Sequence, residues 1–139
     1  MGGHGMFYAS IAGVPWFLIY VGAGGALLVM FGALFIKLTP HNEIEEIREG
    51  NIAAAIGFGG NLIGFAIPLS RCIQQASSIP DLVIWAVLAL TVQFVIFLVL
   101  RLFVPDLSGR IERRDVAAGI LLGAAAIAGG LINAASMSL

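Results

Sequence analysis

The chain has 139 residues, of which 60% are hydrophobic and only 11% are charged. An ordinary globular domain is about 45–50% apolar and about 25% charged, so the composition excludes a typical soluble domain and a disordered chain. The formal net charge of −1 also leaves no basic excess for binding nucleic acid.

Four stretches of the chain carry no charged residue, namely residues 1–36, 50–70, 82–100 and 116–139. A helix crosses a bilayer core of about 30 Å with about 20 apolar residues, and it satisfies its own backbone polar groups there. The sequence shows none of the short alternating segments of a transmembrane barrel. It therefore predicts an all-α integral membrane protein, a four-helix transmembrane bundle that forms a single membrane domain over residues 1–139.

The first predicted helix covers residues 15–36. It has no Lys or Arg before it and is longer than the apolar region of a signal peptide, so we expect a retained span. Ahead of it the chain reads Met-Gly-Gly-His. Removal of Met1 would free an amine, amides and an imidazole that suit Cu(II). We expect Met1 to be retained, and therefore predict no metal ion or other cofactor at this end.

The following loop, residues 37–50, contains a predicted short helix. Asn42 can cap it, Glu43 and the next acids fill the first turn where the helix dipole favours them, and Gly50 can end it. A solvated loop helix explains this pattern. The alternative is a docking surface in which Asn42, Glu43 and Arg48 contact a partner.

The second and fourth predicted helices cover residues 51–72 and 115–136. Asn51 and Asp115 open them and suit the N-cap position, with a ligand contact as the alternative for each. Both helices carry small residues at intervals of four, which let helices approach closely in lipid. We expect these two helices to form the packed centre. The third helix, residues 81–102, has no Gly, and we expect it to face lipid or another subunit.

Polar residues inside the predicted spans are few. Gln93 and Asn61 lie near the middle of their helices, where an interhelical hydrogen bond is the ordinary role and a polar conduction path is the alternative. Pro68 is expected to kink or end the second helix, and Asn133 to bond locally. The alternative for each residue is a place in the lining of an outer vestibule.

The loops between the helices differ in their positive charge. Loops one and three, with their flanks, carry Lys37, Arg48, Arg101, Arg110, Arg113 and Arg114, whereas the opposite side carries only Arg71. Short loops rich in Lys and Arg stay in the cytoplasm. The sequence therefore predicts cytoplasmic loops one and three, with both termini outside. Loop one is acidic and loop three is basic, which is consistent with two arrangements: the loops pair with each other, or they form a bipolar surface for a soluble partner.

The two halves of the chain resemble each other. Residues 111–120 align with residues 47–56 at a shift of 64, and identities recur at Ile47/Ile111, Ala53/Ala117, Ala54/Ala118, Ile56/Ile120, Gly59/Gly123 and Ile63/Ile127. Each half contains a helix, a charged loop and a Gly- and Ala-rich helix. We therefore predict two parallel two-helix repeats, covering about 15–72 and 81–136.

Chemistry-bearing motifs are absent from the sequence. It has no nucleophile–base set and no zinc motif. It has no phosphate-binding glycine loop either, because its glycine runs lie inside the apolar spans and serve packing. His41 stands alone among carboxylates, which does not support a metal site. We therefore predict that the protein is not an enzyme.

Several strings occur in order along nearly the whole chain. They are Thr39-Pro40-His41-Asn42-Glu43, Gly64-Phe65-Ala66-Ile67-Pro68-Leu69-Ser70, Ser78-Ile79-Pro80-Asp81, Gln93 and Asn133-Ala134-Ala135. Together they resemble the YjfL-like bacterial inner-membrane proteins. The resemblance implies a four-helix plasma-membrane protein without a settled activity, often linked with neighbours in membrane stress and polyamine conjugation.

Departures from the family pattern limit what the resemblance implies. The family tends to Asn where this chain has Asp115 and to Cys where it has Ser136, so neither a required amide nor thiol chemistry carries over. Gln93 belongs to the pattern and Asn61 does not. The resemblance therefore favours Gln93 as the functional residue within the membrane.

These observations predict a non-enzymatic protein of the bacterial inner membrane that forms homo-oligomers in the lipid bilayer. Its charged cytoplasmic loops would dock a soluble protein partner in envelope homeostasis or stress. The alternative is a small oligomeric channel or transporter in which Gln93 lines a polar path.

Overall fold

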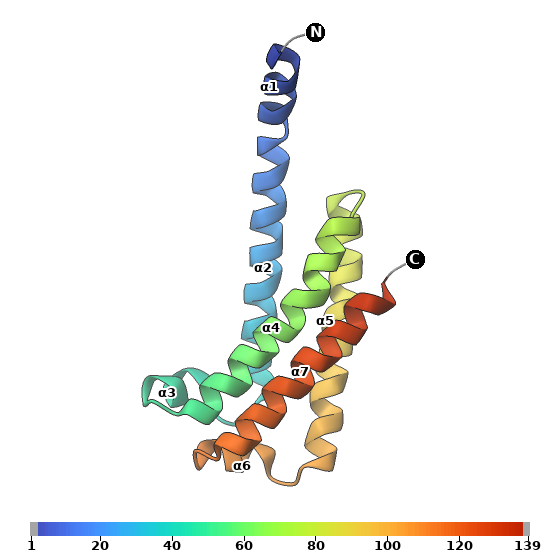
Figure 1. Ribbon diagram of the computed structural model, residues 1–139. Helices are drawn as coiled ribbons and strands as arrows, with labels where there is room; N and C mark the ends of the chain where they lie inside the picture. Colours follow the sequence, from blue (N-terminus) through green and yellow to red (C-terminus); the bar gives the residue numbers. More distant parts are fainter. Residues whose placement is uncertain (1–2, 138–139) are drawn as a thin grey trace.

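The structure is a computed structural model that describes residues 3–137, apart from the side chain of His4, and every regular element in that range is a helix. The helices are α1 (Gly3–Ala12), α2 (Val14–Leu38), α3 (Glu43–Arg48), α4 (Ile52–Gln75), α5 (Ile79–Phe103), α6 (Leu107–Glu112) and α7 (Val116–Ser136) (Figure 1). Four helical runs are long and apolar enough to cross a membrane: Gly5–Leu38, Ile52–Gln75, Ile79–Phe103 and Val116–Ser136. The all-α class and the four membrane-crossing helices are confirmed.

The first of these runs starts earlier than predicted. α1 and α2 follow each other as one long rod that projects beyond the other helices (Figure 1). Hydrogen bonding continues through the break at Gly13, whose N–H donates to Ser10 O at 3.2 Å and whose carbonyl accepts from Phe17 N at 3.0 Å. Pro15 suits the first turn of α2 because it has no N–H to satisfy. The sequence predicts that the first span begins at Pro15, but backbone hydrogen bonds continue on the N-terminal side of this residue.

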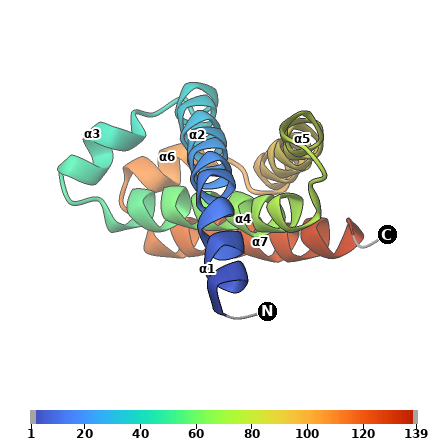
Figure 2. The same ribbon diagram turned by 90° about the horizontal axis from the view of Figure 1, so that it is seen from above.

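α4 and α7 form the centre of the bundle. They lie side by side and run in the same direction, while α2 and α5 both pack on one side of this pair (Figures 1 and 2). Glycine makes the contact possible: an added Cβ on Gly60 would collide with the Cα of Gly123, and one on Gly130 would collide with the carbonyl oxygen of Gly64. The expected central pair is thus confirmed.

α5 is partly buried, in contrast to the expectation that it faces lipid or a second subunit. One face packs inward through residues spaced by three and four, namely Leu82, Ala86, Ala89, Gln93 and Phe97. Large apolar side chains on its other faces stay exposed. One side of α5 therefore belongs to the core of a single chain.

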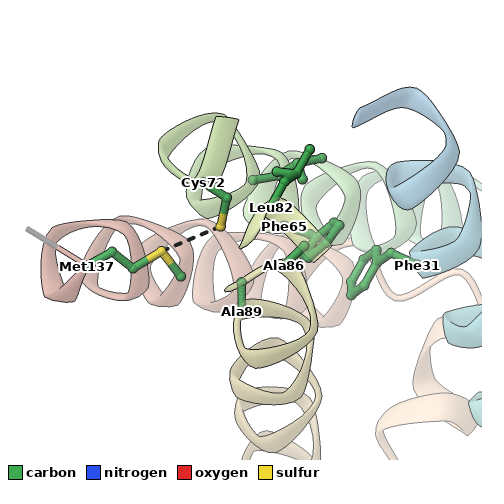
Figure 3. Packing of buried hydrophobic residues seen from close by; sticks show 8 residues of the cluster. Phe31, Phe65, Cys72, Leu82, Ala86, Ala89 and Met137 are labelled. Atoms are coloured by element: carbon green, nitrogen blue, oxygen red, sulfur yellow. Dashed lines mark hydrogen bonds between the residues drawn. The ribbon is translucent and has the colours of Figure 1, made fainter. Parts of the chain in front are cut away.

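The core consists of two clusters. One lies around Phe31, Phe65 and Cys72, and part of it is drawn in Figure 3. The other surrounds Phe35 and Phe97, nearer α3 and α6. Aromatic contacts fix the position of α2: the rings of Phe31 and Phe65 are stacked with centroids 4.6 Å apart, and the rings of Phe35 and Phe97 are tilted with centroids 5.1 Å apart.

The loop before α7 contains α6, a short helix that the sequence does not predict. The turns that follow α3 and α6 share backbone features at positions 64 apart. These are the bonds from Asn51 N to Glu46 O and from Asp115 N to Arg110 O (2.9 Å each), the bonds from Gly50 N to Ile47 O and from Arg114 N to Ile111 O (3.0 Å each), and a left-handed φ of 80° at Gly50 and 64° at Arg114. The two-repeat architecture stays a prediction that this recurrence supports.

Candidate functional site

Both charged connections lie at one end of the bundle and form a single unit. We call this unit, residues 39–51 and 104–115, the loop platform. Two hydrogen bonds join its halves: Asn51 Nδ2 donates to Ile111 O at 2.8 Å, and Arg114 Nη2 donates to Glu49 O at 3.1 Å. Leu107 and Ile111 anchor α6 in the core. The platform is therefore a packed and cross-linked surface, in which the loops do not vary independently.

Asn51 is the buried centre of the loop platform. Its Oδ1 accepts from Ala54 N at 3.2 Å, so the predicted N-cap is confirmed. Its Nδ2 also donates to Glu46 Oε2 at 2.8 Å, in addition to the bond to Ile111 O. The sequence indicated the cap but did not indicate that the same amide joins the two loops.

Asp115 caps α7 from the matching position. Its carboxylate accepts from Ala118 N at 3.4 Å and from Arg110 Nε at 2.8 Å, so this predicted cap is confirmed too. The bond from Arg110 lowers the pKa of Asp115 below its ordinary value, and the backbone N–H groups of Ala118 and Ala117 lower it further. Asp115 therefore stays ionised at neutral pH.

Asn42 caps α3 as expected, since its Oδ1 accepts from Glu45 N at 3.2 Å. Arg48, in the last turn of α3, is exposed. Glu43 differs from the solvated loop residue that the sequence indicated, because it is buried with only 1% of its surface exposed. Of the three candidate docking residues on α3, only Asn42 and Arg48 are presented to solvent.

Glu43 is buried against His41. Nε2 of His41 lies 2.7 Å from Oε1 of Glu43, and each side chain has a relative exposure of 1%. The four side-chain polar atoms of the pair make no well-aligned hydrogen bond within residues 3–137. The contact becomes an ion pair when His41 is protonated. The sequence analysis does not predict this pair. The spacing His-x-Glu at the start of a helix was the available signal.

The pKa of His41 is raised above its ordinary value. Burial alone would lower it, but the polar contact with Glu43 and the negative charges of Glu43, Glu112 and Glu46 outweigh that effect. The protonated imidazole is therefore favoured in the folded protein. The pair can bind and release a proton in the range where histidine titrates.

The remaining charges of the loop platform pair mainly within α6 and its flanks. Arg113 Nη2 lies 3.1 Å from Asp106 Oδ2, with both side chains more than half exposed. Between acidic loop one and basic loop three, a basic side chain of loop three bonds a backbone carbonyl of loop one: Arg114 Nη2 donates to Glu49 O. Exposed ion pairs of this kind contribute about 0–1 kcal/mol each. The charged side chains therefore remain available to a partner.

The polar residues of the spans bond to backbone carbonyls. Gln93 Nε2 donates to Ala126 O at 3.2 Å, while its Oε1 is buried and accepts no hydrogen bond among the described residues. This is the interhelical bond that the sequence predicted. Asn61 instead bonds within its own helix, its Nδ2 donating to Gly57 O at 2.8 Å, because the carbonyl one turn back lies in reach.

The prediction for Asn133 is wrong, and of the kink or end predicted at Pro68 the end does not occur. Asn133 does not bond locally, since its Nδ2 donates to Ala89 O of α5 at 3.1 Å across the α5–α7 contact. Pro68 does not end α4, which continues to Gln75 with the proline ring buried. Packing against neighbouring helices thus overrides the local tendencies of both residues.

No group of three or more His, Cys, Asp or Glu side chains able to hold a metal ion occurs among the described residues. The Met-Gly-Gly-His sequence lies partly outside the range that the structure describes. Metal chemistry at that end is therefore untested.

Comparison with known proteins places the chain among uncharacterised membrane proteins. A family model described as "Domain of Unknown Function (DUF350)" matches residues 9–137. The chain is 43% identical over 122 residues to the UPF0719 inner membrane protein YjfL of Escherichia coli (strain K12), covering 88% of this chain and 92% of that protein. It is 27% identical over 96 residues to the UPF0719 transmembrane protein YshE of Bacillus subtilis (strain 168), covering 68% of this chain and 72% of that protein. No solved structure matches.

Proposed function

We propose, from the premise that the chain belongs to the DUF350 family, that it is an oligomeric docking protein of the bacterial inner membrane. Its loop platform faces the cytoplasm and binds a soluble protein that acts in envelope homeostasis or stress. The family carries no assigned activity, and no catalytic set of side chains was recognised in the sequence. The proposed role is therefore recruitment rather than chemistry.

The cross-linked loop platform is the observation that carries this proposal. Asn51 joins α4 to Ile111 of α6 and to Glu46 of α3, so both short helices are fixed before any partner arrives. A preformed surface avoids the entropy cost of ordering loops on binding. Loops that only connected the membrane helices would need neither the short helices α3 and α6 nor the hydrogen bonds that join the two loops.

The charges of the loop platform support a polar partner surface. Glu45, Glu49, Arg48 and Arg113 are all exposed, so both signs are present on one face. Such charge patterns govern specificity and association rate more than affinity. The expected partner therefore carries its own mixed charges, and binding should weaken as salt is raised.

A pull-down from solubilised membranes tests the docking proposal. One variant carries Glu45→Lys with Glu49→Lys, and another carries Arg48→Glu with Arg113→Glu. We expect each to recover less than about a tenth of the partner that the unmodified chain recovers, since facing like charges cost several kcal/mol. Gln74→Lys adds a charge at the opposite end of the bundle and should change nothing. Unchanged recovery with both reversed variants contradicts the proposal.

The α1–α2 rod supports an assembly of several copies. Its apolar side chains face outward, with Met6, Tyr8 and Phe17 more than 60% exposed in the single chain. Further copies would cover part of this surface within the bilayer. A single cysteine introduced as Ile11→Cys in a Cys72→Ser background should form a cross-link between two copies of the chain in native membranes. A protein that stays monomeric in native membranes and in mild detergent argues against assembly.

The channel alternative depends on Gln93, and the contacts of Gln93 favour docking instead. The side chain of Gln93 is only 2% exposed, and it extends from α5 to the backbone of α7 within the same chain. A residue that lines an aqueous path would face that path. Flux through reconstituted vesicles that is lost in Gln93→Leu would restore the channel as the better proposal.

A further inference from the structure

α3 is held in the loop platform mainly by polar contacts. Of its six residues, all within the described range, Glu43 alone is buried, while Ile44 is exposed and Ile47 is partly buried. The helix lies at the edge of the bundle (Figure 2). Because a helix of this length is not stable alone, the contacts at its two ends decide whether it keeps its place.

The two ends of α3 are held in different ways. Near its C-terminal end, Glu46 Oε2 accepts from Asn51 Nδ2 at 2.8 Å, and Asn51 N donates to Glu46 O at 2.9 Å. At its N-terminal end, Glu43 Oε1 lies 2.7 Å from His41 Nε2 in the connection from α2. The contact at the start of α3 therefore depends on whether an imidazole carries a proton.

The Glu43 carboxylate depends on His41 for a compensating charge. Both side chains are almost completely buried, and their four polar atoms make no well-aligned hydrogen bond among the described residues. While the imidazole carries its proton, the two charges offset each other. Once the proton leaves, the carboxylate keeps its charge in a place sheltered from water, which is strongly unfavourable.

Further acidic groups act on His41 from two helices. They are Glu46 of α3 and Glu112 of α6. Burial of the imidazole alone lowers its pKa, but the contact with Glu43 and these two negative charges raise it above the ordinary value of about 6.5. The proton is therefore bound below that value and leaves as the pH rises through the raised one.

We propose that the buried pair of His41 and Glu43 is a proton switch that controls the loop platform. With the proton bound, the pair holds α3 in place; without it, α3 leaves the bundle and the Glu43 carboxylate reaches water. α3 carries Glu45 and Arg48, two exposed charges of the proposed docking face. A partner of the preformed platform is therefore bound at low pH and released as the pH rises. This last step rests on the proposed docking function, whereas the release of α3 does not.

Cysteine labelling of the purified full chain tests the switch without any partner. Ile47→Cys places a thiol where α3 packs against the core, and Glu49→Cys places one at an exposed position, each in a Cys72→Ser background. The ratio of their maleimide labelling rates corrects for the effect of pH on thiols. We expect a constant ratio below about pH 6. Above about pH 6.5 it should rise by up to about tenfold per pH unit, the limit for release of one proton.

Three further changes, each added to both labelling variants, identify the pair as the source of that rise. Glu43→Gln removes the charge that needs compensation, so the ratio should no longer rise with pH. Glu112→Gln removes an exposed charge that favours the proton on His41, so at low salt the rise should move to lower pH. Glu45→Gln makes the same change at an exposed position of α3 and should leave the rise in place. A constant ratio with none of these changes, or no shift in Glu112→Gln, overturns the proposal.

Recovery of the partner over the same pH range connects the switch to docking. Recovery by the unmodified chain should fall as the labelling ratio rises, and recovery by Glu43→Gln should not. Release of α3 without any loss of the partner overturns the control of docking by the pair. A chain that recovers no partner at any pH contradicts the docking function alone, because the labelling result does not involve a partner.

Discussion

At the scale of single residues, Asn51 and Asp115 both cap a central helix, but their second hydrogen bonds run in opposite directions. Each caps a central helix and each bonds a side chain five positions earlier, but Asn51 donates to Glu46 while Asp115 accepts from Arg110. Only Asn51 reaches across to the other loop, at Ile111. One amide thereby holds three parts of the loop platform together.

The first prediction concerns Asn51. Asn51→Ala removes a cap and the amide that bonds Glu46 and Ile111 O, which keeps only its bond from Arg114 N. We therefore expect a loss of about 2–4 kcal/mol from the cap and the side-chain bonds together. Asn42→Ala removes only an exposed cap and should cost about 1 kcal/mol or less. Thermal unfolding of both variants in the same detergent measures the difference. Equal losses would show that Asn51 acts only as a cap.

The second prediction concerns the buried pair of His41 and Glu43. Because folding raises the pKa of His41, the pair stabilises the fold fully below the ordinary histidine pKa of about 6.5, and this stability is lost as pH rises through the raised value. The melting temperature of the unmodified chain should therefore fall as the pH rises above about 6.5.

Glu43→Gln is the matched variant for this pH dependence, since it keeps the size of the side chain and removes its charge. Its melting temperature should be lower below about pH 6.5 and nearly flat over the same range. An unchanged slope in Glu43→Gln would assign the dependence to another group.

At the scale of elements, close contact between α4 and α7 depends on particular glycines and not on glycine content. Gly60 sits against the backbone of Gly123, whereas Gly59, its neighbour in sequence, has nothing within 4 Å of an added Cβ. The two positions therefore give a matched pair for testing the contact.

The third prediction is that Gly60→Ala destabilises the bundle by about 1–3 kcal/mol, because the backbone of α7 cannot give way as a side chain does. Gly59→Ala should be neutral or slightly stabilising, since alanine is the better helix former. Denaturation in mixed micelles measures both. The same loss at both positions would indicate that helix flexibility rather than contact determines stability.

Sequence reasoning succeeded for elements that depend on long patterns and failed for short ones. The four spans follow from charge-free length, which the bilayer imposes. The sequence does not predict α6, because only Leu107 and Ile111 mark its buried face. In addition, Asp106 before it adopts a left-handed φ of 57° and its side chain makes no capping hydrogen bond. The burial of Glu43 is not predicted for a related reason. An acidic residue in the first turn of a helix is usually solvated, and only the fold shows that His41 covers this one.

At the scale of the whole molecule, the loop platform and the cavity lined by Cys72, Trp85 and Met137 occupy opposite ends of one bundle. The bias of Lys and Arg predicts, by the positive-inside rule, that the platform lies in the cytoplasm. On that prediction the cavity opens on the outer side, along with both termini.

The fourth prediction tests this orientation with single cysteines in a Cys72→Ser background. Ser77→Cys should react with a membrane-impermeant maleimide in intact spheroplasts, while Glu49→Cys should react only after the membrane is opened. Both positions are exposed, so burial does not explain a difference. The reverse labelling pattern would place the loop platform outside and end the cytoplasmic docking proposal.

The length of the α1–α2 rod has a consequence for the lipids around it. Its run of 34 residues corresponds to about 51 Å of helix at about 1.5 Å per residue, against a hydrocarbon core of about 30 Å. A helix with this hydrophobic mismatch tilts or thickens the bilayer beside it, at a cost of fractions of a kcal/mol per Å. Longer acyl chains reduce that cost for α1–α2, while the shorter α7 gains nothing from them. A change in bilayer thickness therefore affects the free energy of the α1–α2 rod more than that of α7.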